Sequence, residues 1–424
     1  MNRTYNPTQS ISVTHYLSII SIAIAFASIY TSKAGLSIAL VLMLITSIVK
    51  FSIKQNINSN KHLLFNLSNF MIISYIVGLA LSFLPLYEIH DLLWFAQKGA
   101  YLLVFSLFFT SLIKYKGIAV RLALLGLLVA MGYALLLFSQ SSVGQRPASF
   151  WDVGRWSEVL AYSIAALIPY IHNRKKNPLT DKTSLLLFIT IILCFASLLI
   201  TGSRGPLLFL FIALFIYYLL SHRKLFLLFV FSSICFLYSS YLIPELNIIY
   251  ARVISIFSSS DYSNNARILM WANALNFIQY NIENNISLFI FGIGDKNVEH
   301  YLISFLQSIG SIDAMQESAG YQLSFNDFHN AYLDTLIKTG VVFFAFYVSS
   351  IGYITFTLIK LIKKGVTLAW SGLVMLLTHL GIGLVYSNGM EYQTVIFYLM
   401  MTLVFAYCVP SVTQKEKVDN VTPN

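Results

Sequence analysis

The short stretch T-G-S-R-G-P, residues 201–206, has the residue types of an anion-binding turn at the start of an apolar helix. Ser203 or Thr201 could cap free N–H groups of that helix, and Pro206 suits its first position. The helix dipole and the Arg204 guanidinium would both attract phosphate oxygens, while the flanking Gly205 would let the backbone approach a ligand closely. The alternative, an interfacial arginine that anchors to lipid headgroups, stays open.

A second arginine lies in N-N-A-R-I-L-M-W, residues 264–271, which opens an amphipathic helical pattern that runs to about Tyr280. The two asparagines are capping candidates, and Arg267 and Trp271 share a helix face at spacing i, i+4. Arg267 is either a snorkelling arginine of an interfacial helix or a second phosphate ligand directed at the same site. The pattern favours neither interpretation.

A histidine lies within the third motif, F-N-D-F-H-N-A-Y-L-D, which begins at residue 325 and leads into a predicted helix that ends at Gly340. Near the start of that helix, a neutral His329 imidazole could accept a proton, and Asp327 could orient the ring. The alternative is a solvated histidine at a helix N-terminus.

Metal and nucleotide motifs are weak in this sequence. Asp295, Glu299 and His300 form a D-x-x-x-E-H cluster that matches neither a zinc nor a magnesium arrangement. There is no P-loop and no nucleic-acid-binding module. We therefore expect no metal, no cofactor and no nucleic-acid partner.

The composition indicates the elements that must position these residues. Of 424 residues, 57% are hydrophobic and 10% charged, against about 25% charged in soluble domains. A membrane helix needs about 20 apolar residues. These numbers predict an all-α integral membrane protein of about twelve transmembrane helices. The apolar runs lie at 14–31, 34–52, 64–85, 92–113, 118–139, 156–171, 183–201, 205–221, 224–243, 341–360, 367–386 and 392–409.

Charge predicts the orientation. With both termini and the loops at 50–63, 114–117, 172–182, 221–224 and 360–366 in the cytoplasm, the inner segments hold 18 of the 27 basic residues, as the positive-inside rule requires. The expected organisation is therefore helices one to nine over 1–243, a periplasmic segment of short helices over 244–340, helices ten to twelve over 341–410, and a cytoplasmic tail over 411–424. The net charge of +10 reflects this topology.

In chain order, S-R-G, A-R-I-L-M-W and H-N-A-Y-L-D-T-L-I-K-T-G resemble motifs of the O-antigen ligase and polymerase superfamily. The similarity is specific over residues 201–205, 266–294 and 328–340. It implies that Arg204 and Arg267 bind a lipid-linked pyrophosphate and that His329 lies at the reaction centre. Further substrate contacts are expected from the same motifs at Ser203, Gly205, Trp271, Asp327 and Asn330.

The implied reaction transfers an O-antigen glycan from undecaprenyl pyrophosphate to lipid A–core, on the periplasmic face of the bacterial inner membrane. It inverts the anomeric centre and needs no metal, and the expected partners are these two substrates and membrane lipids. An O-antigen polymerase that joins undecaprenyl-linked repeat units is the main alternative. A protein O-oligosaccharyltransferase is disfavoured by the short C-terminal tail. A flippase or transporter would need more charge within the spans.

Overall fold

The structure of the protein, a computed structural model, is helical throughout the residues that it describes, which contain no strand. This confirms the expected all-α class. The predicted loops at 50–63 and 172–182 and the end of the tail lie partly outside the described residues. The described ranges are 7–52, 62–84, 89–140, 146, 148–173, 181–244, 247–258, 261–310 and 312–419.

The predicted apolar runs largely coincide with helices in the described residues, although the run at 92–113 is divided between the helices Ile89–Lys98 and Tyr101–Gln140. At the loop predicted over 114–117 the structure has a kink: two helices meet at Tyr115, whose φ of −114° and ψ of 18° are not helical. The membrane-body helices are α1 (Pro7–Ser28), α2 (Lys33–Ser52), α3 (His62–Leu81), α4 (Ile89–Lys98), α5 (Tyr101–Gln140), α6 (Val153–His172), α7 (Lys182–Thr201), α8 (Arg204–Ser221), α9 (Arg223–Leu242), α15 (Ala331–Lys363), α16 (Ala369–Gly383) and α17 (Tyr392–Asp419).

Six described helical segments are long and apolar enough to cross a membrane, and four shorter apolar helices accompany them. One of the six, Asp91–Gln140, contains two of the predicted runs. Helix α9 exposes nearly its whole apolar surface, with Leu227 and Phe231 69% and 65% exposed. Such a surface is stable in lipid and not in water. The chain is therefore a multi-pass membrane protein, whereas the count of twelve crossings stays a prediction.

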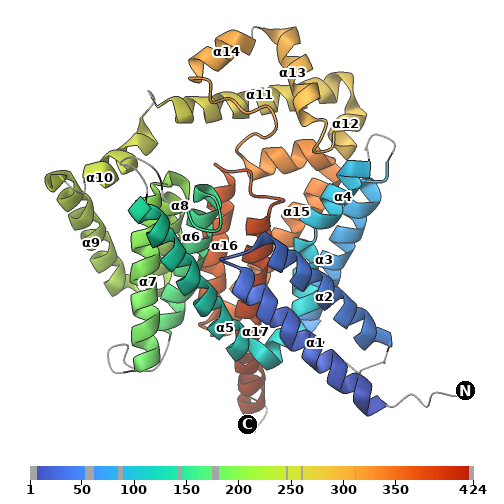
Figure 1. Ribbon diagram of the computed structural model, residues 1–424, viewed down its shortest axis with the longest axis vertical. Helices are drawn as coiled ribbons and strands as arrows, with labels where there is room; N and C mark the ends of the chain where they lie inside the picture. The colour runs from blue at the N-terminus through green and yellow to red at the C-terminus, as the bar shows by residue number, and fades with distance from the viewer. Residues whose placement is uncertain are drawn as a thin grey trace, which may run out of the picture.

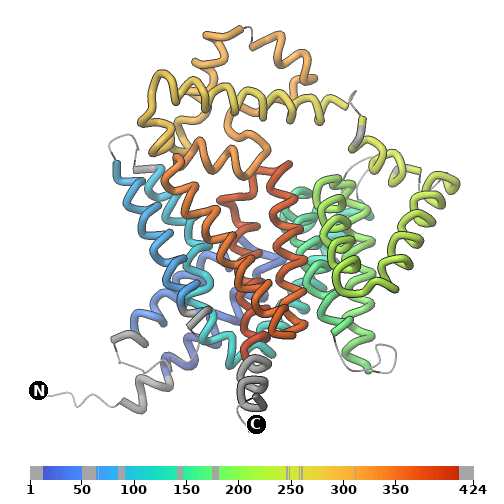
Figure 2. Tube along the Cα trace, turned by 180° about the vertical axis from the view of Figure 1, so that it is seen from behind, coloured from blue at the N-terminus to red at the C-terminus, as the bar shows by residue number. Residues whose placement is uncertain are grey.

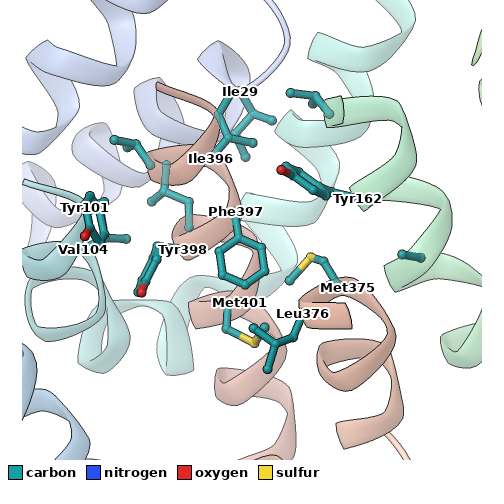
Figure 3. Packing of buried hydrophobic residues seen from close by; sticks show 14 of the residues in the cluster. Ile29, Tyr101, Val104, Tyr162, Met375, Leu376, Ile396, Phe397, Tyr398 and Met401 are labelled. Carbon is teal, nitrogen blue, oxygen red and sulfur yellow. The ribbon is translucent and has the colours of Figure 1, made fainter. Parts of the chain in front are cut away.

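Helices α16 and α17 form the centre of the bundle. Helix α16 packs against α6, α8 and α15, and α17 packs against α5 and α6. Figure 3 shows this core, in which Phe397 of α17 lies near Met375 of α16 and Tyr162 of α6, all nearly inaccessible to solvent. Two helices buried on all sides give the bundle a rigid axis, and the loop that joins them reaches the site described below.

The segment predicted to hold short helices lies across one end of the bundle (Figures 1 and 2), and its helices are short except for one of 23 residues, Tyr262–Asn284. It has small apolar clusters of its own, including Phe277, Phe305 and Phe328, and α12 packs against α15. Helix α15 breaks at the predicted Gly340, where φ is +76°. The helices of this segment are α10 (Asn247–Ile254), the 3-10 helix η2 (Ser255–Phe257), α11 (Tyr262–Asn284), α12 (Ile286–Phe291), α13 (Val298–Ile309) and α14 (Ile312–Ser318).

Candidate active site

The T-G-S-R turn connects α7 to α8 through Gly202, whose φ of +60° favours glycine. Helix α8 begins at Arg204, so the expectation that Pro206 occupies the first helical position is wrong by two residues. Ser203 stands at the N-cap but makes no side-chain capping bond, since its hydroxyl is used elsewhere. Arg204 is thus the first residue of α8, at the positive end of the helix dipole.

An arginine that the motifs did not indicate holds this turn in place. Arg146 donates from Nε to the Thr201 carbonyl at 2.8 Å and from Nη2 to the Ser203 hydroxyl at 3.0 Å. It comes from the polar loop between α5 and α6, far from the turn in sequence. Ser203 therefore positions a second cation beside Arg204.

Arg204 is oriented by a bidentate ion pair with Asp261, at 2.9 and 3.2 Å. It also donates to the Ser255 carbonyl at 3.2 Å. Asp261 is the N-cap of α11 and accepts from the Asn264 backbone N–H, so the prediction that an asparagine caps this helix is wrong. The hydrogen bond from Arg204 lowers the pKa of Asp261 below its ordinary value.

Arg267 lies over the ring of Tyr386, 5.8 Å from its centroid, in a cation–π contact. Its Nε is buried and has no hydrogen-bond partner among the described residues. Burial, together with the positive charge of Arg204, lowers the pKa of Arg267. Gly205 also lies close to this ring, since a Cβ there would lie 2.7 Å from a ring carbon of Tyr386.

These side chains line a cavity of about 440 Å³ whose walls carry several positive charges, and we call it the arginine cavity. Four arginines line it, namely Arg146, Arg204, Arg252 and Arg267, with Gly205, Trp271 and Tyr386 among the other lining residues. Guanidinium groups bind phosphate oxygens in a bidentate manner. The cavity is therefore suited to a ligand with several phosphate charges, such as a pyrophosphate.

His329 has an unusual backbone conformation, with φ of +46°, that turns its side chain back onto Asp327. One carboxylate oxygen of Asp327 accepts from the His329 backbone N–H at 3.0 Å and also contacts ring Nδ1. Burial would raise the pKa of Asp327, but the hydrogen bond and charge of His329 outweigh it, so the pKa lies below the ordinary value. With Nδ1 bound to a carboxylate, Nε2 is the atom that can accept a proton.

His329 and Asp327 line a second cavity, of about 290 Å³, which is rich in carboxylates and which we call the acidic cavity. Tyr386 lines both cavities, so they adjoin. Trp271 of the arginine cavity donates from Nε1 to the His329 carbonyl at 3.4 Å. The structure thus brings an anion-binding region next to a candidate base.

Two of the predicted contact residues line neither of these cavities. Ser203 is bonded to Arg146, and Asn330 caps α15 by accepting from the backbone N–H groups of Tyr332 and Leu333 at 3.0 and 3.1 Å. In the structure, both side chains therefore form hydrogen bonds with other residues of the protein.

Sequence reasoning missed Arg146, Arg252 and Glu158. For the two arginines, the available signal was that both lie in segments predicted to be periplasmic, where the positive-inside rule makes basic residues uncommon. Glu158 is a carboxylate within an apolar helix, and it lines the acidic cavity while only 1% exposed.

The D-x-x-x-E-H cluster is not assembled into a metal site. Asp295 forms an ion pair with Lys338 at 2.8 Å, whereas Glu299 and His300 are exposed on α13. Among the described residues, no group of three or more His, Cys, Asp or Glu side chains could hold a metal ion.

The fold and site define a multi-pass helical membrane protein with an arginine-lined cavity beside a His–Asp pair. Residues 189–348 match the family model described as O-antigen ligase, and the chain therefore carries an O-antigen ligase family domain. Arg204, Arg267 and His329 all lie within the matched residues. A domain of this family is typical of membrane enzymes that transfer glycans and that use lipid-linked glycans as substrates. The comparison with curated proteins found no match.

Proposed function

We propose that this protein is a lipopolysaccharide O-antigen ligase, which transfers the O-antigen glycan from undecaprenyl pyrophosphate to lipid A–core at the periplasmic face. The observation that carries the proposal is the arginine cavity adjoining the His329–Asp327 pair. Phosphate recognition and proton acceptance are the two tasks that such a transfer requires.

The donor pyrophosphate would occupy the arginine cavity. Its charge exceeds what one guanidinium can neutralise, and the cavity offers four. Arg267 has a buried Nε without a hydrogen-bond partner among the described residues, which leaves a donor for an anionic ligand. Arg204 is held in a fixed geometry by Asp261, which limits reorganisation when negative charge develops on the leaving group.

The reaction would be a single displacement. The acceptor hydroxyl attacks the anomeric carbon, the bond from that carbon to the pyrophosphate oxygen breaks, and its electron pair leaves with the pyrophosphate. His329 Nε2 takes the hydroxyl proton, and Asp327 stabilises the imidazolium that forms. Attack opposite the leaving group inverts the anomeric centre. Arginines supply the stabilising charge, so no divalent metal is required.

The same proposal includes a topology. Twelve spans place both termini in the cytoplasm, with helices one to nine over 1–243, ten to twelve over 341–410, and a tail over 411–424. Residues 244–340 face the periplasm, consistent with their position across one end of the bundle (Figure 1). Both cavities contain residues from that segment.

A lipopolysaccharide gel of a deletion strain tests the function. If the protein is the ligase, the strain makes lipid A–core without any ladder, and long polymer accumulates on the lipid carrier. Core capped by a single repeat unit indicates instead the polymerase, which uses the same leaving group and a lipid-linked acceptor. Complementation with the wild-type chain must restore the ladder.

A further inference from the structure

The acidic cavity has a charge opposite to that of the arginine cavity. Only two cations line it, Arg155 and Lys338, and both already form ion pairs with its carboxylates. Lys98, which does not line it, pairs with Glu391. With Lys98 counted, six carboxylates stand against three cations, and one of the six, Asp327, contacts the His329 ring. The lining carboxylates are Asp152, Glu158, Asp295, Asp327, Asp334 and Glu391.

Three nearly buried side chains of this cavity have acceptor oxygens without donors among the described residues: Asn388 Oδ1, Gln393 Oε1 and Asp334 Oδ1. Their exposures are 1%, 6% and 8%. The amide orientation of Asn388 is determined by its Nδ2, which donates to Glu158 at 2.9 Å, so its oxygen is the atom left over. Buried acceptors without donors are unfavourable, and a ligand that brings donors would relieve them.

The volume and the aromatic lining of the cavity suit a single sugar ring. Its volume of about 290 Å³ is at the lower end of small-molecule pockets, which span about 300–1,000 Å³. Trp94 and Tyr386 supply aromatic surface against which the apolar face of a pyranose can pack. His329, which must reach the attacking hydroxyl, lines the same cavity.

We infer that the acidic cavity is the acceptor subsite, and that it selects a terminal sugar bearing hydroxyl or amino groups over one bearing a phosphate or carboxylate. Hydroxyl and amino groups donate hydrogen bonds to the unpartnered oxygens. A phosphate or uronate group brings acceptors and negative charge, which these oxygens and carboxylates repel. The inference rests on the proposed function, because it is the transfer reaction that defines an acceptor.

Binding to the full-length protein in detergent tests this selectivity without the reaction. The probes are three trisaccharides that differ only in the terminal residue: glucose, glucosamine or glucuronic acid. We expect the first two to bind at least about tenfold more tightly than the third, a difference of about 1.4 kcal/mol. Prior addition of the lipid-linked donor should leave binding of the glucose probe in place.

Charge variants connect the selectivity to this cavity. The double variant Asp152→Asn, Asp295→Asn should reduce the ratio of the dissociation constants of the glucuronic acid and glucose probes several-fold; this ratio is the affinity gap. The double variant Asp152→Glu, Asp295→Glu should preserve the gap, which separates charge from damage to the fold. Asp313→Asn, on the exposed surface of α14, is the matched control and should change nothing.

Equal or tighter binding of the glucuronic acid probe overturns the inference. So does a gap that the Asn variant leaves unchanged, because the selectivity then arises elsewhere. Loss of glucose-probe binding when donor is present assigns the cavity to the donor sugar and overturns the acceptor assignment. If the probes bind with the expected selectivity but no acceptor is ever glycosylated, the proposed function fails while the cavity's preference stands.

Discussion

The indole N–H of Trp271 donates to the backbone carbonyl of His329 at 3.4 Å. Trp271 lies one helical turn after Arg267 on α11, so this contact connects the helix that carries Arg267 to the loop that carries His329. The contact adds to the Asp327 contact that orients the His329 ring.

Arg204→Ala and Arg267→Ala should each lower transfer by about 10²–10³, because each removes one donor that stabilises the leaving pyrophosphate. Lysine at either position should rescue only partly, since a point charge does not reproduce the bidentate fork. Transfer is measured with purified protein and lipid-linked glycan. Arg223→Ala, at the start of α9, is the control, and an equal loss there would contradict the assignment.

His329→Ala should abolish transfer while binding of the lipid-linked donor largely survives, because the imidazole takes a proton and does not contact phosphate. Removal of a general base typically lowers the rate about 10²–10⁴-fold. Asp327→Asn should lower the rate with donor binding intact, since the ring loses its orienting carboxylate. His300→Ala, the other histidine of the long outer segment, serves as the control. Rapid turnover by the His329 variant would exclude it as the base.

The Asp261–Arg204 ion pair should make the free energy of unfolding decrease as the pH falls into the acidic range. The pKa of Asp261 in the folded protein lies below the ordinary value of 3.8. Its contribution is therefore fully present above about pH 4 and is lost as the pH falls through the lower folded value. The difference in Tm between wild type and Asp261→Asn should stay constant from pH 7 to 5 and narrow below pH 4. A difference that grows on acidification contradicts this sign.

Transfer should proceed in EDTA, because guanidinium groups provide the charge that a divalent ion supplies in other enzymes. The assay compares chelated protein with protein supplied with magnesium or manganese. Complete loss in EDTA, restored by either ion, would refute metal independence and direct attention to the carboxylates of the acidic cavity.

The proposed topology is tested by cysteine labelling in a variant that lacks Cys194, Cys235 and Cys408. An impermeant reagent applied to intact spheroplasts should label a cysteine at position 313 of α14 and leave one at position 364 unlabelled until the membrane is permeabilised. Labelling of position 364 in intact cells would reverse the orientation.

Local patterns in the sequence were sufficient for the helices and for part of the site. Apolar runs mark helices because each backbone group in lipid must be paired within its own segment. The S-R-G turn and the His329 region were recognisable because glycine, arginine and histidine have specific local chemistry. The exact start of α8 and the capping residue of α11 were mistaken, since capping depends on which neighbouring groups compete for a side chain, as Arg146 does for Ser203.

What only the tertiary structure decided is which distant residues share a cavity. Arg146 comes from the loop between α5 and α6 and Arg252 from α10, and both line the same cavity as Arg204 at the start of α8. No local spacing in the sequence encodes this arrangement. Glu158 is hidden within an apolar helix, and its importance depends on Asn388 and Gln393 arriving from the loop between α16 and α17 and from the start of α17. Sequence alone determines which segments enter lipid, because hydropathy is a property of each segment. The charge of a cavity is a property of residues that meet only after folding.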